Sequence, residues 1–187
     1  MVPRPIAFVS TLSEAGILNL APFSFFTVAS CNPPVLCFTP MVNFRGRRRD
    51  TLINIEQTRE FVVNVVFEAF AERMNETSAD VPPEVDEFVL SGLTAIKSAV
   101  VRPPRVKEAQ VNFECRLIEA RSFGAEPLSG TLVLGAVVRI HVDEACCDDL
   151  RVDPERLRAI GRMGGSTYAR TTDRFEMARP EVKPGTR

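Results

Sequence analysis

The chain has 187 residues, which is about one domain's worth and enough to bury a substantial core. Hydrophobic residues make up 45% and charged residues 25%, the balance of an ordinary globular protein. The formal net charge of -1 excludes a strong overall attraction to nucleic acid or to an anionic membrane, so any anion site must be local.

No targeting or membrane segment is evident in the sequence. No apolar run approaches the roughly 20 residues that span a bilayer, and Ser10 and Thr11 interrupt the first apolar stretch too early for a signal peptide. The five cysteines form no CxxC pair. Most of them are expected to be buried as small hydrophobic residues, in a protein that resides in a reducing compartment. We therefore expect a cytoplasmic protein with no membrane and no nucleic-acid partner.

The N-terminal part predicts strands separated by proline breaks. Four strand-like runs cover residues 5–11, 18–21, 23–28 and 35–39, in which aromatic and β-branched residues are frequent. Pro22 is expected to interrupt the chain between the second and third runs, and prolines 33 and 34 to separate the third from the fourth.

A basic loop then leads into the first predicted helix. The loop, residues 45–49, contains four arginines, and Asp50 is a good N-cap for the helix that follows. Residues 61–66 are apolar on both faces, which predicts a buried strand. A short helix over 68–75 and a long loop over 78–86 come next.

Two long strands form the clearest predicted pair. Residues 111–117 alternate between apolar and polar side chains, as in a half-buried strand. Residues 131–143 alternate too, with an apolar row from Leu132 to Val142 on one face and His141 on the other. Residues 124–130 are expected to join the two strands as a hairpin loop.

The last part predicts a short helix and a glycine-rich loop. Asp153 is expected to start the helix, with Pro154 in its first position, and the loop covers residues 163–168. Many short strands, few helices and no internal repeat predict a single mainly β domain over residues 1–179, a barrel with a few short decorating helices. Residues 180–187 are expected to form a flexible tail.

The sequence lacks several common motifs of catalytic and metal sites. His141 is the only histidine, which excludes a zinc site built on two or three histidines, and we expect no metal site. No GxSxG, GxxxxGK[ST] or GxGxxG motif is present, which argues against an α/β-hydrolase, a P-loop site and a Rossmann site. A serine hydrolase would have to pair His141 with a serine that the fold alone places.

Three features could carry chemistry, and each also has a structural interpretation. In residues 19–26, Pro22 frees the local backbone to face a planar ligand, and the alternative is a bulged strand with core phenylalanines. Residues 47–51 combine arginines, a threonine hydroxyl and a helix start that could hold a phosphate, and the alternative is a solvated basic loop. A lone histidine such as His141 is more often a surface or structural residue.

Taken in order, these segments resemble the flavin reductase-like family of FMN-binding split barrels. The resemblance covers nearly the whole chain, and its motifs are weak singly but strong as an ordered set. Family members usually carry residues before the first motif, on which this sequence almost begins, and the basic loop is unusually rich in arginine. The matching runs are 3–11 (PRPIAFVST), 19–26 (NLAPFSFF), 32–35 (NPPV), 49–55 (RDTLINI), 61–64 (FVVN), 85–88 (VDEF), 92–94 (GLT), 114–115 (EC), 135–143 and 164–168 (GGSTY).

The resemblance implies a split β-barrel that forms a homodimer and holds FMN near the subunit interface. It implies that residues 21–24 line the isoalloxazine ring, that residues 49–51 lie on the phosphate side and that Asn64 supports the ribityl side. His141 stands where the family often has a histidine near the approach of the nicotinamide. The cofactor-binding residues that the resemblance implies are Asn19, Ala21, Pro22, Phe23, Ser24, Thr39, Arg49, Asp50, Thr51 and Asn64.

The family includes NAD(P)H:flavin reductases, which supply reduced flavin to monooxygenases, and flavoredoxin-like electron carriers. The first hypothesis is therefore an NAD(P)H-dependent flavin reductase that passes hydride from NADH or NADPH to FMN and serves a flavin-dependent monooxygenase or another electron acceptor. One alternative is an electron carrier that binds FMN tightly without nicotinamide turnover. The other is a barrel that keeps the fold but has lost the ligand. Chemistry that belongs to a cofactor needs no acid–base cluster, which agrees with the scarcity of catalytic motifs.

Overall fold

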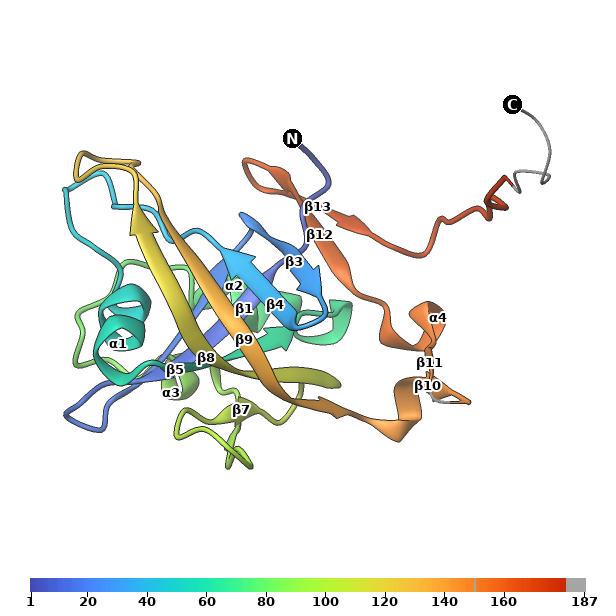
Figure 1. Ribbon diagram of the computed structural model, residues 1–187, viewed down its shortest axis with the longest axis horizontal. Coiled ribbons are helices and arrows are strands. Elements are labelled where there is room, and N and C mark those ends of the chain that lie inside the picture. Colours follow the sequence, from blue (N-terminus) through green and yellow to red (C-terminus); the bar gives the residue numbers. More distant parts are fainter. Residues whose placement is uncertain (150, 181–187) are drawn as a thin grey trace.

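The computed structural model describes residues 1–149 and 151–180, and Figure 1 shows them arranged around one curved sheet. Seven antiparallel strands form this sheet in the order β2-β1-β5-β8-β9-β4-β3. The strands are β1 (Ala7–Leu12), β2 (Leu18–Phe23), β3 (Phe26–Cys31), β4 (Pro34–Phe38), β5 (Glu60–Val65), β8 (Val111–Ser122) and β9 (Thr131–Val142).

Short helices and small hairpins decorate the sheet. The helices are α1 (Asp50–Thr58), α2 (Ala71–Glu76), α3 (Glu87–Ser91) and α4 (Pro154–Leu157), with 3-10 turns η1 (Glu68–Phe70) and η2 (Glu144–Cys146). Three two-stranded pairs complete the fold: β6 (Ala95–Ile96) with β7 (Arg105–Val106), β10 (Cys147–Asp148) with β11 (Arg151–Val152), and β12 (Ile160–Gly164) with β13 (Thr167–Arg170). None of the helices in the described ranges is long and apolar enough to cross a membrane.

The two edge strands of the sheet are consecutive in the chain, which forces the sheet to curl. In a flat sheet, six strand spacings of about 4.8 Å would separate β2 from β3 by about 29 Å. Only Ser24 and Phe25 lie between Phe23 and Phe26, a span of about 11 Å at most. The sheet therefore closes into a barrel, which stays split because β2 and β3 do not pair with each other. We call this junction the seam.

The core lies on both faces of the first strand. Ala7 and Val9 belong to a buried cluster inside the barrel, together with Phe38 and Phe61. Phe8, between them, points to the opposite face and packs in a second cluster with residues of α2, α3 and β7. Side chains alternate across a strand, so this burial on both faces fixes the register of β1.

Pro22 does not end a strand, contrary to the sequence-based expectation. It lies inside β2 and is paired with Phe8 of β1, and the interruption falls instead at the seam. A proline is tolerated here because β2 is an edge strand, so the missing N–H leaves no ladder hydrogen bond unmade.

The predicted helix start is wrong by one residue. Arg49, not Asp50, is the N-cap of α1, and no side chain caps this helix. Asp50 is the first helical residue, and its carboxylate accepts two hydrogen bonds from Arg47. Asp153 is confirmed as the N-cap of α4, whereas the glycine-rich loop predicted over residues 163–168 is wrong, because β12 and β13 extend into it and only Gly165 and Ser166 lie between them.

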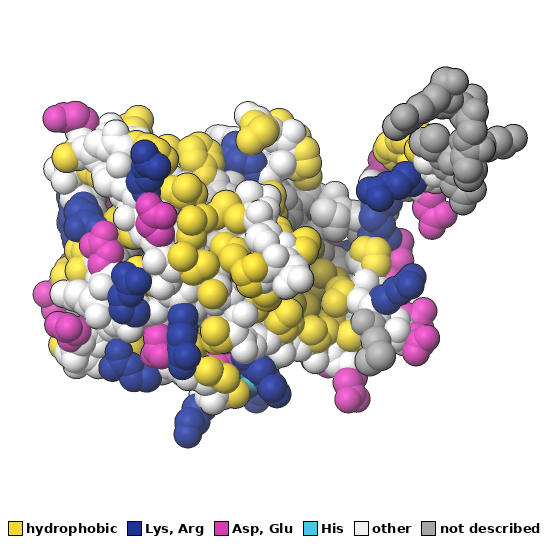
Figure 2. All heavy atoms as spheres, viewed as in Figure 1, with side chains coloured by type: hydrophobic (Ala, Val, Ile, Leu, Met, Phe, Trp, Pro, Cys, Tyr) yellow, Lys and Arg dark blue, Asp and Glu magenta, His cyan; other side chains and the backbone are white. Residues whose placement is uncertain are grey.

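The apolar row of β9 faces outward, and the core receives the opposite row. Val133 is fully buried, whereas Val138, Ile140 and Val142 are 37%, 50% and 39% exposed. Figure 2 shows hydrophobic side chains spread over the middle of the face that carries β3, β4 and β9. The predicted tail, residues 180–187, lies outside the described residues except for Pro180.

Candidate functional site

A pocket of about 290 Å³ lies at the seam, where the free edge of β2 meets the start of α1 and the loop that follows α2. Because β2 pairs only with β1, backbone C=O groups along its other edge remain available to a ligand, whereas the N–H of Leu20 is taken by Glu87 and Pro22 has none. The pocket is lined by Asn19, Ala21, Pro22, Phe23, Ser24, Phe25, Thr39, Met41, Arg47, Arg48, Arg49, Asp50, Thr51, Thr77, Ser78, Ala79, Asp80, Val81 and Glu87.

Nine of the ten residues expected at the cofactor are brought together in this pocket. Residues 19–24 come from the edge strand, Thr39 from the chain just after β4, and residues 49–51 from the start of α1. The backbone N–H of Thr39 donates to the carbonyl of Phe25 at 2.8 Å, which ties the two sides of the seam together.

A buried polar network forms the floor of the pocket around Asn19. The hydroxyl of Thr51 donates to Asn19 Oδ1 at 2.6 Å, and that of Thr11 does so at 3.2 Å. Asn19 Nδ2 donates to Glu87 Oε1 at 2.8 Å. The side-chain amide of Asn19 is thereby fixed in one orientation, so the pocket floor is rigid before any ligand binds.

Glu87 is a buried carboxylate at the pocket wall that sequence reasoning did not identify. Its side chain is almost fully buried, and its second oxygen accepts the backbone N–H of Leu20 at 3.0 Å. Burial raises the pKa of Glu87, although the hydrogen bonds from Leu20 and Asn19 oppose this effect. The carboxyl therefore links α3 to β2 at the wall of the pocket.

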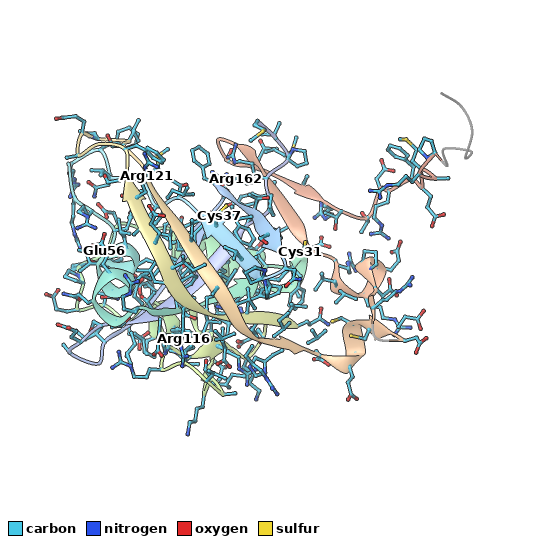
Figure 3. All side chains as sticks on the ribbon, viewed as in Figure 1. Cys31, Cys37, Glu56, Arg116, Arg121 and Arg162 are labelled. Atoms are coloured by element: carbon cyan, nitrogen blue, oxygen red, sulfur yellow. The ribbon has the colours of Figure 1, made fainter. Side chains whose placement is uncertain are left out.

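Three of the four arginines of the basic loop are each paired with a carboxylate. Arg47 binds Asp50 at 2.6 Å, Arg48 binds Glu56 on α1 at 2.6 Å, and Arg49 binds Asp80 at 3.4 Å; Figure 3 labels Glu56. Asp50 also raises the pKa of Arg47 through their hydrogen bonds. The predicted phosphate cradle is therefore less positive than its sequence suggests.

The start of α1 supplies a separate attraction for anions. The first N–H groups of a helix have no acceptor within the helix, and here no side chain caps them. They lie at the pocket, since residues 49–51 line it. Aligned peptide dipoles make this end of the helix partly positive, which favours a phosphate independently of the arginines.

Asn64 is the expected cofactor residue that does not reach the pocket. Its side chain is fully buried on β5 and donates to the carbonyl of Phe8 at 2.9 Å. Its Oδ1 accepts from the backbone N–H of Val106 and from Asn112 Nδ2, each at 2.9 Å. In this position Asn64 joins β1, β5 and β8 rather than lining the site.

His141 also lies apart from the pocket. Its Nε2 is 2.6 Å from Oε1 of Glu114, whose side chain has no exposed surface. Glu114 accepts three further hydrogen bonds from the backbone N–H groups of residues 99–101, at 2.6–3.0 Å. Burial alone would raise the pKa of Glu114, but these hydrogen bonds and the one to His141 together hold it below its ordinary value.

The remaining wall of the pocket comes from residues that the motifs did not indicate. The loop over residues 77–81 was expected as a loop, but nothing in the sequence places it against the start of α1. Asp80 makes this contact by binding Arg49 and by accepting from Asn43 Nδ2 at 3.0 Å.

Comparison with known proteins identifies the family. The model of the flavin reductase like domain matches residues 1–161 of the chain. The chain belongs to the flavin reductase-like domain family.

Solved structures agree with this assignment. Nitrilotriacetate monooxygenase component B from Bacillus cereus is 37% identical, with a TM-score of 0.89 over 95% of this chain and 88% of its own. The 2-nitrobenzoate 2-nitroreductase NbaA from Pseudomonas fluorescens is 33% identical, with a TM-score of 0.86 over 98% of this chain and 88% of its own. A Shewanella frigidimarina structure described by its split barrel domain is 24% identical, with a TM-score of 0.82 over 95% of this chain and 86% of its own, and confirms the expected fold.

Proposed function

We propose that the protein binds FMN in the seam pocket and acts as an NAD(P)H-dependent flavin reductase. The observation that carries this proposal is the convergence, in a member of the flavin reductase-like family, of an uncapped helix start and a free strand edge on one pocket. The free strand edge offers backbone carbonyl groups and the hydroxyl of Ser24 to a planar heterocycle, and the helix start offers N–H donors to a phosphate.

The residues of the pocket fit FMN. Its volume of about 290 Å³ lies at the lower end of the range for small-molecule sites. Phe23 and Pro22 supply apolar surface, while Ser24 and Thr39 add hydroxyl groups near the seam. We assign residues 21–24 to the ring system of the flavin and residues 49–51 to its phosphate.

The protein's part in the reaction is to bind and orient. FMN, when bound, supplies the redox chemistry by taking up a hydride from NADH or NADPH. Asn19, held by Thr51 and Glu87, keeps the pocket floor in place during turnover. The contact between His141 and the nicotinamide stays a prediction.

We also propose a homodimer and an electron-accepting partner. The exposed apolar row of β9 gives a second copy of the chain a surface to cover, since contiguous apolar patches on a globular protein mark interaction sites. The similarity to a monooxygenase component B supports a flavin-dependent monooxygenase as the acceptor.

An absorbance spectrum and an anaerobic titration test the proposal. Protein saturated with FMN is expected to be yellow, and addition of NADH or NADPH is expected to bleach it while the nicotinamide is oxidised. If FMN is bound but nicotinamide is oxidised no faster than in a protein-free blank, the reductase hypothesis is contradicted and the electron-carrier hypothesis remains. Failure of the protein to quench the fluorescence of added FMN would contradict both.

A further inference from the structure

A second hollow adjoins the seam pocket and contains two arginines of its own. It has a volume of about 300 Å³ and shares Pro22, Ser24 and Ser78 with the seam pocket. Arg4, from the chain before β1, and Arg162, from β12, both line it. A molecule in this hollow would therefore lie next to whatever occupies the seam pocket.

The backbone places these two arginines directly opposite each other. Arg4 N–H donates to the carbonyl of Arg162 at 3.0 Å, and Arg162 N–H donates to the carbonyl of Arg4 at 2.8 Å, in an isolated antiparallel bridge. Side chains opposite each other in such a bridge project to the same side, with Cβ atoms about 5 Å apart. Like charges in this position repel each other, so the arrangement favours an anion between them.

No carboxylate in the described ranges neutralises either arginine. Neither Arg4 nor Arg162 takes part in an ion pair there, whereas the three arginines at the start of α1 each have an acidic partner. The unpaired positive charge near the seam thus lies in the second hollow rather than in the predicted phosphate cradle.

Both guanidinium groups are held in place by contacts that leave donors free. Arg4 lies 5.4 Å from the ring centre of Phe25 and donates from Nε to the hydroxyl of Ser24 at 3.2 Å. Arg162 lies 4.5 Å from the ring centre of Tyr168 and donates to its hydroxyl and to the carbonyl of Gly165. Stacking occupies the face of a guanidinium and not its edge, so N–H groups remain for an oxyanion.

We propose that Arg4 and Arg162 bind the phosphate or carboxylate group of the second substrate, the molecule that exchanges electrons with the flavin. The inference rests on the proposed function for the flavin itself, because only a flavin in the seam pocket makes the neighbouring molecule a redox partner. A planar guanidinium pairs well with either oxyanion, so the hollow selects an anionic co-substrate over a neutral one.

Binding measurements on the FMN-loaded protein test the subsite without requiring turnover. Titration calorimetry with pyrophosphate and, separately, with benzoate is expected to show binding of at least one of them, weakened about tenfold or more in Arg4→Gln and in Arg162→Gln. Arg121→Gln, which removes an exposed arginine on β8, is the matched control and is expected to bind like the parent; Figure 3 labels Arg121 and Arg162. The tighter of the two anions identifies the group that the site takes.

Kinetics with two hydride donors give the second readout. NADH carries phosphates, whereas 1-benzyl-1,4-dihydronicotinamide carries the same reacting ring without them. If pyrophosphate is the tighter anion, both glutamine variants are expected to raise KM for NADH about tenfold and to leave the rate with the neutral donor within about twofold of the parent. If benzoate is tighter, competition by benzoate against the neutral donor is expected to weaken by the same factor.

Three outcomes would overturn the proposal. The first is that neither anion binds the FMN-loaded protein. The second is that each anion binds the parent and the glutamine variants equally well. The third is that the two variants lose FMN affinity about tenfold, which would show that the arginines hold the phosphate of the flavin itself. If the protein does not oxidise nicotinamide but anion binding depends on both arginines, the anion subsite is supported and the proposed reductase activity is contradicted.

Discussion

At the scale of single residues, Thr51 links the pocket to the buried polar network. Its hydroxyl donates to Asn19 at 2.6 Å, and the residue is 1% exposed. We expect Thr51→Ala to weaken FMN binding about tenfold and to lower the free energy of unfolding by about 1 kcal/mol, since one buried hydrogen bond is lost. Fluorescence-quenching titration and thermal unfolding measure the two effects.

Thr51→Ser provides the control for this prediction. Serine keeps the hydroxyl and loses only a methyl group, so FMN affinity should return to within a fewfold of the parent. Equal losses in the alanine and serine variants would show that packing of the methyl group, and not the hydrogen bond, matters at this position.

Glu114 makes the stability of the fold depend on pH. The pKa of Glu114 is lowered in the folded state. The ionised carboxylate therefore contributes its full stabilisation of the fold above its unfolded pKa of about 4.3, and this stabilisation is lost as the pH falls through the folded-state pKa. We expect Glu114→Gln to lower the free energy of unfolding by about 1–3 kcal/mol at pH 7. The difference from the parent should shrink as the pH falls below the unfolded value, since the parent then loses the stability that its lowered pKa provides.

Denaturant unfolding across a pH series measures this dependence. Glu119→Gln is a matched control, because Glu119 lies exposed on the same strand. A difference between parent and Glu114→Gln that stays constant down to pH 3 would contradict an ionised role for Glu114.

At the scale of strands, β5 and β9 approach closely at one glycine. A Cβ added to Gly135 would lie 2.3 Å from Cζ of Phe61, whose ring is fully buried in the barrel. We expect Gly135→Ala to lower the free energy of unfolding by about 1–3 kcal/mol, because the ring cannot move without disturbing the core. Thermal denaturation measures the loss.

Gly124→Ala serves as the comparison for Gly135→Ala. There the nearest atom is Oγ of Ser129 at 2.7 Å, the end of a short side chain that can rotate away. If both substitutions cost the same, the close packing of Phe61 on β9 would be contradicted.

The strands also show why the inward face of β9 could not be read from its sequence. Both of its rows contain apolar residues, so alternation alone does not say which row is buried. Glu114 of β8 pairs with Arg139 and Cys115 with Val137, which leaves Val138 as an extra residue on β9, and the alternation of β9 shifts there. Glu114 itself is buried because the backbone of residues 99–101 covers its carboxylate.

At the scale of the whole molecule, the outward row of β9 predicts self-association. Ile140 is 50% exposed, so Ile140→Asp should leave the core intact and turn the proposed dimer into a monomer. Light scattering after size exclusion measures the mass. Val89→Asp, at a position 79% exposed on α3, is the control and should leave the mass unchanged. A parent protein that is monomeric at high concentration would contradict the prediction.

Much of the candidate site was predictable because it is made of contiguous runs. Residues 19–24 and 49–51 form two contiguous runs, so recognising each run also located one side of the pocket, eight of its nineteen lining residues. The residues that escaped prediction, such as Glu87 and Asp80, reach the pocket from distant segments through long-range packing. Asn64 matched a motif but lies in the core, because a motif records residue identity and not the direction of a side chain.

The seam has a mechanical consequence for the whole barrel. The ladder of hydrogen bonds stops at β2 on one side and at β3 on the other, and only two residues bridge them. A ligand bound there would connect β2 and β3, the two neighbouring strands of the barrel that share no hydrogen bonds. Saturation with FMN should therefore raise the melting temperature, and amide exchange should slow most in residues 21–26, where the free protein opens first.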